Sequence, residues 1–428
     1  MRTILLTALL VAAGAAGAAA QDQPAGGQAT PRKRGLSWKD DRPTIVFGED
    51  VTLGIRGRLQ LDWRQFDPDI DQETYDFRTA RIGVQGDLTR HFSYEVEREI
   101  DREAQFGAWK DVYLAWKTFD AVRVKAGRFK MPFGLEQNTG PTETDFAYRS
   151  LASTTIAPGR DRGVMMYGEV GRIAYEAGVF DDDGDNAELE RDRFVMEGAD
   201  LEGVGPSFAG RIRADLLRAL PAPDRLKGAN FGFAYTNAYV PEGLNSLKGE
   251  AVWGDDFFER VYVKGRRQRM GVQFDWTPGP TGLKAEWMQS REQRLGQSNR
   301  NEDLSDFLAT GWYVSGTWFV TGEDKDDNIN PRRPLFHGGV GAVELGVRFD
   351  ALELRSAGQD GTPYTNPRAD SQVPNSDRVW TFGVSWMPIR WVRVVTNAVH
   401  ETFDDVSRAP ESGVASYWSG VLRLQVVF

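Results

Sequence analysis

The chain has 428 residues, with 62 acidic and 52 basic side chains and no cysteine. Its mean hydropathy of −0.47, together with the lack of any run of eighteen apolar residues, excludes a bundle of membrane-spanning helices. The net charge of −10 argues against a nucleic-acid partner, and without cysteines the fold must be stabilised by hydrogen bonding and packing and not by disulfides.

The first twenty residues have the features of a secretory signal peptide. Arg2 precedes the apolar run 4–11, and small residues lead to Ala20. This run is shorter than the ~20 residues of a transmembrane helix, so we expect cleavage after Ala20, with loss of Arg2 changing the net charge from −10 to −11. Residues 21–50 are expected to form an N-terminal periplasmic extension, flexible over 21–42, where Gly, Pro, Gln and basic residues show no periodicity.

From Val51 onwards, apolar residues recur at every second position, which is typical of β-strands with one apolar face. In the first run the odd positions from Val51 to Trp63 are apolar or glycine, whereas the even ones, such as Arg56 and Asp62, are mostly polar. A strand of this length exceeds the ~5 to 6 residues usual in globular proteins and suits a tilted membrane strand of ~9 to 11 residues plus an extension.

The same alternation returns along the rest of the chain. It is clear in residues 80–88, 208–216, 231–235, 270–276, 343–350, 380–386 and 422–428. At roughly 25 residues for each strand and its connection, the chain after the signal peptide holds about sixteen strands. Residues 51–428 are therefore predicted to form an all-β fold, a transmembrane antiparallel β-barrel. A secreted all-β sandwich with buried tryptophans remains an alternative explanation of the alternation.

Turn-rich, often acidic stretches separate the predicted strands and are interpreted as loops. The most acidic is 181–186, where carboxylates at nearby positions could also bind calcium. This stretch lacks the spaced bidentate glutamate of an EF-hand, so a solvated loop is the simpler interpretation.

Several segments resemble the phosphate-selective porins O and P. The most specific is GRFKMPFGLE at residues 127–136, followed by YRSL at 148–151 and APGR at 157–160, in the order of that family's strand, in-folded constriction loop and return strand. The remaining matches are GRLQ at 57–60, ARIGV at 80–84, GWYV at 311–314, FVTGE at 319–323 and VELGVR at 343–348. The last strand also resembles the end of outer-membrane barrels, whose final aromatic residue, here Phe428, is recognised by the assembly machinery.

The resemblance implies a sixteen-stranded barrel, usually a homotrimer, whose narrow lumen carries a ladder of Arg and Lys that attracts phosphate or other anions. Arginine suits this task because its planar fork pairs with two phosphate oxygens and stays charged. The candidate pore-lining and anion-binding residues are Arg56, Arg58, Arg81, Arg123, Lys125, Arg149, Arg160, Arg162, Arg213 and Arg348. Arg64, Arg211 and Arg423 share the inward register, and Arg149, Arg160 and Arg162 are expected at the narrowest point.

Acidic residues in the inward register favour a second possibility. Glu95, Glu97 and Glu99 would face the arginines and create a mixed ladder, as in a general diffusion porin without anion selectivity. An outer-membrane hydrolase is the alternative from another class, since Glu95 and Glu97 lie ~7 Å apart on one strand face. The three histidines show no catalytic or metal-binding spacing.

The sequence therefore predicts a bacterial outer-membrane porin and not an enzyme, with no cofactor and no metal. Its water-filled channel is expected to pass small anionic solutes, including phosphate or polyphosphate. Its expected partners are outer-membrane lipid, small anions, two further copies of the chain and the barrel-assembly machinery, which would bind Phe428.

Overall fold

The computed structural model of the chain describes residues 35–39, 42–47, 50–67, 74–100, 109–187, 189, 205–215, 228–325, 329–356 and 366–428. The predicted signal peptide, residues 1–20, lies outside the described residues, and so does most of the predicted 21–50 extension.

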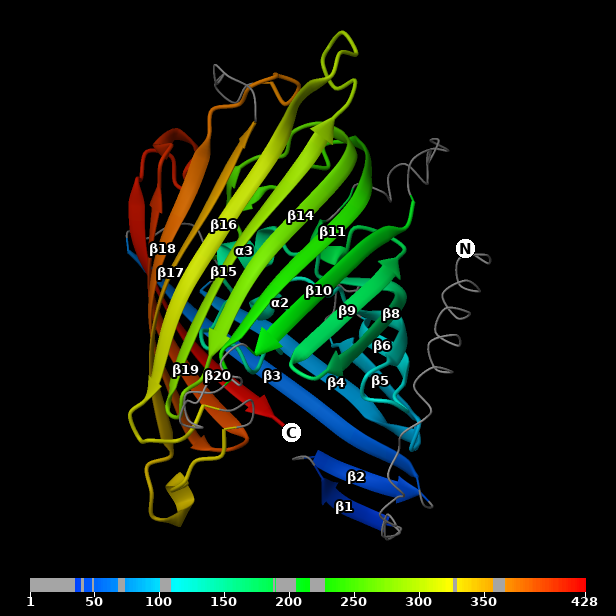
Figure 1. The fold of residues 1–428 in the computed structure, drawn as a ribbon. Helices are drawn as coiled ribbons and strands as arrows, with labels where there is room; N and C mark the ends of the chain where they lie inside the picture. Colours follow the sequence, from blue (N-terminus) through cyan, green and yellow to red (C-terminus); the bar gives the residue numbers. More distant parts are fainter. Residues whose placement is uncertain are drawn as a thin grey trace.

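Over the described residues, sixteen strands pair antiparallel with their neighbours in chain order and close into a barrel (Figure 1). The last barrel strand pairs with the first, with Trp418 opposite Asp67 and Val427 opposite Arg58. This confirms the predicted antiparallel barrel of about 16 strands. The barrel strands are β3 (Val51–Asp67), β4 (Tyr75–Thr89), β5 (Phe92–Glu99), β6 (Trp109–Trp116), β7 (Arg123–Lys130), β8 (Arg160–Val170), β9 (Ile173–Phe180), β10 (Ser207–Asp215), β11 (Asn230–Gly243), β14 (Val263–Trp276), β15 (Thr281–Arg294), β16 (Leu304–Phe319), β17 (Ala342–Ser356), β18 (Asn375–Ile389), β19 (Val392–Phe403) and β20 (Ser416–Val427).

The helical elements are short and lie in connections between strands. They are α2 (Leu135–Asn138), α3 (Leu151–Thr155), η2 (Asp185–Ala187), η5 (Leu335–His337) and η6 (Val406–Arg408). None of the helices in the described ranges has the length and apolarity needed to cross a lipid bilayer.

The alternation in the sequence becomes the two faces of the barrel wall. In β3 the indole of Trp63 is exposed on the outside, whereas the neighbouring Asp62 is buried on the inner face. On the outer face, the neighbouring strands β17 to β20 place four aromatic side chains side by side, namely Phe349, Trp380, His400 and Trp418. Such a row is typical of the girdle that lies at a membrane interface.

One rim of the barrel holds the two-residue connections β4–β5, β8–β9 and β18–β19, together with Phe428. Short turns are typical of the periplasmic rim of outer-membrane barrels. Below this rim, β1 (Gly35–Lys39) and β2 (Arg42–Phe47) form a hairpin that pairs with the start of β3 (Figure 1). The predicted flexibility of residues 21–42 is wrong for Gly35–Lys39, because β1 pairs along its whole length with β2. The strand β2 itself contains the β-branched and aromatic run from Thr44 to Phe47.

Two connections on the opposite rim fold into the lumen. The constriction loop, residues 131–159, contains α2 and α3, and the hairpin loop, residues 244–262, contains β12 (Gly249–Glu250) and β13 (Asp256–Phe258). Both pack on apolar inner-wall side chains, among them Leu352 and Val399, in one hydrophobic cluster. The inner face is therefore apolar where these loops cover it. Simple alternation of apolar and polar residues does not anticipate this.

The C-terminal residue is seated on a glycine. Phe428 and Gly57 exchange two backbone hydrogen bonds of 2.9 and 3.0 Å, and the Phe428 ring covers Gly57 so closely that an added Cβ would lie 2.4 Å from the ring. Only glycine leaves room for the ring at this position of β3.

Replacing Gly57 with Val is expected to displace the Phe428 ring and to destabilise the barrel by about 1–3 kcal/mol, as overpacking does in other proteins. The measurement is the temperature at which the folded, fast-migrating band is lost in gel electrophoresis with detergent. Gly316→Ala is the matched control, because a Cβ there would make only ordinary contact, 3.6 Å from Leu283. Equal transition temperatures for Gly57→Val and wild type would show that packing of the Phe428 ring on Gly57 does not stabilise the barrel.

Candidate pore constriction

The constriction loop is fixed to the barrel wall at its first helix. The Glu286 carboxylate of β15 accepts hydrogen bonds from the backbone N–H groups of Leu135 (2.5 Å) and Glu136 (2.9 Å), where α2 begins. The Tyr313 hydroxyl of β16 donates to the same carboxylate at 2.9 Å. A carboxylate at the first turn of a helix satisfies amide groups that have no partner within the helix.

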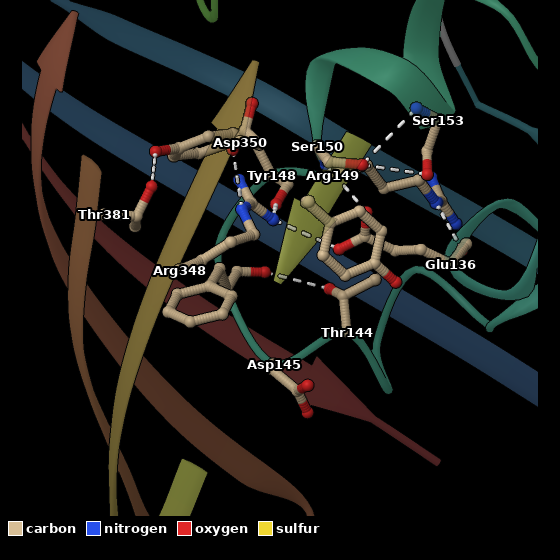
Figure 2. Close-up of polar contacts among 12 residues, drawn as sticks. Glu136, Thr144, Asp145, Tyr148, Arg149, Ser150, Ser153, Arg348, Asp350 and Thr381 are labelled. Carbon is tan, nitrogen blue, oxygen red and sulfur yellow. Dashed lines mark hydrogen bonds and ion pairs between the residues drawn. The ribbon is translucent and has the colours of Figure 1, made fainter. Parts of the chain in front are cut away.

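A second set of contacts holds the middle of the loop (Figure 2). The Arg348 guanidinium of β17 lies 3.1 Å from the Glu136 carboxylate and 2.9 Å from that of Asp350, and it donates to the Tyr148 carbonyl at 3.1 Å. The Tyr148 hydroxyl lies 2.5 Å from Oγ1 of Thr381. Because Arg348 and Asp350 are fully buried, these contacts join loop to wall in a region that solvent does not reach.

The tip of the loop lies towards the periplasmic rim. The Asp145 carboxylate pairs with the ammonium groups of Lys325 (2.7 Å) and Lys284 (2.9 Å). Burial alone would raise the pKa of Asp145, but these two cations lower it below its usual range. Arg393 donates to the Thr144 carbonyl at 2.7 Å. The tip is therefore held by charges on β15 and β19 and by Lys325, which follows β16.

Below the loop is an open vestibule. A cavity of about 480 Å³ lies between the loop and the periplasmic rim, and Phe428 is at its edge. Seven cationic and four acidic side chains line it, namely Arg42, Arg56, Arg58, Lys284, Lys325, Arg390 and Arg393, and Glu143, Asp145, Asp275 and Glu344. Cations therefore outnumber carboxylates in this lining, although several of them are paired.

The predicted arginine ladder on β3 and β4 is matched by carboxylates on β5. Glu97 lies 2.7 Å from Arg58, 3.2 Å from Arg81 and 3.5 Å from Arg56, while Glu99 pairs with Arg81 at 2.5 Å and Glu95 with Arg56. Three arginines therefore face three glutamates. This is the mixed ladder that the inward acidic residues predicted.

Most other inward arginines are paired in the same way. Arg423 holds Asp62 through two bonds of 2.6 and 2.7 Å, and Arg160 holds Asp111 at 2.7 Å. The remaining pairs are Arg64 with Asp76, Arg211 with Glu176 and Arg123 with Asp120. These side chains carry little net charge into the lumen.

Three cations at the constriction have no such partner. The Lys130 ammonium and the Arg149 guanidinium both donate to the carbonyl of Thr139 at 2.8 Å, and Arg149 also donates to the Glu136 carbonyl at 2.9 Å. Neither forms an ion pair with a described residue. Arg78 forms no ion pair or hydrogen bond with the described part of the chain, and it is exposed.

These cations lie close together. Burial, together with the neighbouring charges of Arg160, Arg78 and Arg81, lowers the pKa of Arg149 to about 10, so Arg149 stays charged at neutral pH. The loop and the facing wall therefore bring an unbalanced positive charge to the narrow part of the lumen. An anion could approach it without displacing a protein carboxylate.

Sequence reasoning did not select Arg78 and did not include Lys130 among the candidates. Arg78 lies at a β-bulge, because Gln60 is opposite Thr79 whereas Asp62 is opposite Asp76. A bulge changes which face a side chain occupies, and no local sequence signal marks this one. Lys130 is the last residue of β7, where the chain turns inward.

The other predicted residues occupy different environments. Lys125 faces inward against the rings of Tyr113, Phe129 and Tyr167, at 4.4 to 5.4 Å. Arg213 also faces inward, is half-buried and forms no ion pair with a described residue. Arg348 faces inward too, but the constriction loop covers it completely, so solutes cannot reach it.

Arg162 does not face the pore, contrary to its prediction. Along adjacent strands it is in line with Arg128, Val112, Val96 and Val84, which belong to the outer face. Its side chain is 70% exposed and pairs with Asp181 at 3.3 Å. The prediction failed because Arg160, two residues earlier, bends into the lumen at the end of the strand, so the two do not share a face.

The acidic stretch 181–186 binds arginines. Asp183 is buried between Arg267, at 2.5 Å, and Arg269, while Asp185 pairs with Arg128 at 2.8 Å. Over the residues that the structure describes, no group of three or more His, Cys, Asp or Glu is placed to hold a metal ion. The stretch thus ties an extracellular connection to the barrel wall.

A closed barrel with a polar lumen, narrowed by an in-folded loop and with a row of aromatic residues on its outer face, defines the class of outer-membrane channel proteins. The sequence model of the family "phosphate-selective porin O and P" matches residues 53–428, and the chain belongs to this family. It is a porin of the bacterial outer membrane, from a family of channels.

Individual relatives are distant in sequence. Porin O of Pseudomonas aeruginosa is 24% identical, and the match covers 89% of each chain. Among solved structures, the anion-selective porin from Comamonas acidovorans is 12% identical, with a TM-score of 0.52, and covers 89% of this chain and all of that one. The trimer form of OmpT from Vibrio cholerae is 11% identical, with a TM-score of 0.51 and the same coverage. At such identities the solved structures support the fold alone.

Proposed function

We propose that this porin is a channel for small anions, of which phosphate or polyphosphate are the best candidates. The observation that carries the proposal is the set of unpaired cations, Arg78, Lys130 and Arg149, at the constriction. A pore in a low-dielectric wall focuses the field of its unbalanced charges and raises the local concentration of the opposite ion. The name of the family and that of the Comamonas acidovorans porin agree with an anion as solute.

Passage rather than tight binding is expected. Thr139 already accepts hydrogen bonds from two of the three cations, so an anion would gain only part of their donors. Several weak sites in series allow an ion to enter and to leave. The partly exposed Arg56 and Arg81, although paired with glutamates, would add donors on the way to the vestibule.

A general diffusion porin is the second candidate. The inner wall carries three arginines paired with three glutamates, namely Arg56, Arg58 and Arg81 with Glu95, Glu97 and Glu99. This network creates a local electric field but no excess of positive or negative charge. If this network dominated, the channel would select by size with little preference for anions. The same ion pairs occupy Glu95 and Glu97, so neither is free to act as a hydrolytic acid or base.

For the assembly, we propose a homotrimer in outer-membrane lipid, with export directed by residues 1–20 and assembly promoted by Phe428. A trimer agrees with the structural neighbour solved in that form. Deletion of Phe428 should lower the amount of folded barrel in the outer membrane without preventing export.

The reversal potential in a planar bilayer tests the ion preference. Under a potassium chloride gradient we expect the sign given by chloride as the faster ion, and we expect added phosphate to reduce the chloride current in proportion to its occupancy. A reversal potential of the opposite sign would reject the anion channel. A value near zero with no effect of phosphate would favour the general diffusion porin.

A further inference from the structure

Two carboxyl groups are buried together beneath the hairpin loop. Asp377 of β18 and Glu401 of β19 face the lumen on neighbouring strands, and neither has any exposed surface. Glu401 is opposite Val379, two residues after Asp377, so the two carboxyl groups are diagonal neighbours on the same face of the wall. Each acts electrostatically on the other, and Glu401 also on Tyr417 of β20. Both oxygens of Asp377 and Oε1 of Glu401 lack a donor in hydrogen-bond geometry within the described residues.

No cation balances this pair. Neither Asp377 nor Glu401 forms an ion pair with any described Lys, Arg or His. The titratable groups that face the pair are Asp350 from β17, Tyr417 from β20, Asp255 from the hairpin loop and Tyr148 from the constriction loop. Arg348, which also contacts the Tyr148 ring, is already paired with Asp350.

The pair is also an attachment point for the hairpin loop. The backbone N–H of Val252 donates to Oε2 of Glu401 at 2.8 Å. Two further bonds support it, from Trp253 Nε1 to Ser419 Oγ and from Asn375 Nδ2 to the Phe257 carbonyl, both of 2.8 Å. Glu401 is the ionisable anchor at the tip of the hairpin loop, whereas Glu292 and Arg267 hold the start of the loop at Leu247 and Asn245.

Ionisation of both carboxyl groups would place two adjacent negative charges in a fully buried site where no described cation pairs with them, which is strongly unfavourable. A proton shared between them removes one charge, gives Asp377 a hydrogen-bond partner and leaves Glu401 able to accept from Val252. We infer that Asp377 and Glu401 share one proton, and that this proton keeps the hairpin loop in the lumen. Its loss at alkaline pH releases the loop and widens the channel.

Cysteine labelling tests the release, because the chain has no native cysteine. Ala251 lies in the hairpin loop and is buried, so Ala251→Cys should react with a maleimide only when the loop leaves the wall. The rate is compared with that of the double variant Ala251→Cys/Asp377→Asn, in which the amide replaces the protonated carboxyl and cannot titrate. The thiol is the same in both proteins, so its own ionisation cancels in the ratio.

At pH 7 the two rates should agree, and at pH 10 the protein with Asp377 should react about fivefold faster or more, as expected for local opening of one segment. Its single-channel conductance should rise reversibly over the same pH range. Asp404→Asn, which changes an exposed carboxylate after the end of β19, is the matched control and should behave as wild type. Equal rates at pH 10 would overturn the proposal, and so would a conductance rise that persists in Asp377→Asn.

Discussion

Arg149→Glu is expected to lower the ratio of chloride to potassium permeability about thirtyfold, because two units of charge change at ~4 Å from the ion path and each unit contributes ~1 kcal/mol even in water. Arg149 is the best single position because it is an unpaired cation carried by the constriction loop. The ratio follows from reversal potentials measured under a potassium chloride gradient.

The matched control is Arg162→Glu, which makes the same change of charge on the outer face of β8. It should leave the permeability ratio at the wild-type value. Since Arg149 also bonds to the loop backbone, a second variant, Arg78→Glu, separates charge from loop geometry, because Arg78 forms no hydrogen bond or ion pair with a described residue. If the permeability ratio is unchanged in both Arg149→Glu and Arg78→Glu, the unpaired cations at the constriction do not determine the ion preference.

The barrel itself could be predicted from the sequence because one simple rule governs its wall. Alternate residues meet lipid and lumen, so the run from Val51 to Trp63 already shows the register of β3. The constriction loop could be predicted as well, but only through the family resemblance of residues 127–160. No local pattern in that loop specifies that it folds inward.

The charge balance of the lumen could not be predicted, since it depends on pairing between strands. Arg58 and Glu97 are 39 positions apart in the chain, yet their side chains lie 2.7 Å apart. Arg78 became a lumen cation only through a bulge, and Arg162 left the predicted set because one strand end bends. The sequence thus predicted the inward orientation of side chains more reliably than their ion pairing, and the pairing decides which of them can bind a solute.

The inner-wall apolar residues have a similar explanation. Leu354 and Val379 occupy lumen-facing positions that the barrel pattern would make polar. They are apolar because the in-folded loops cover them and form a hydrophobic core inside the barrel. The lumen is therefore narrowed by packed protein and not by charge alone, and the strength of that packing determines whether the constriction persists.

Arg348→Met is accordingly expected to open the channel. The substitution removes a fully buried cation and leaves Glu136 and Asp350 without their counter-charge, which costs about 3–5 kcal/mol in comparable buried pairs. The constriction loop loses its central attachment to β17, although Glu286 still holds α2. We expect single-channel conductance to rise about twofold and current noise to increase, because a loop freed from its packing samples open states.

Arg355→Met on the same strand is the control, since Arg355 is partly exposed and, among the described residues, pairs with the exposed Glu353. Its conductance should match that of wild type. If the loop moves in Arg348→Met, anion preference should fall together with the rise in conductance, because Arg149 and the shared carbonyl of Thr139 move with it. A rise in conductance with selectivity intact would mean that the loop limits the size of the pore while the filter lies on the barrel wall.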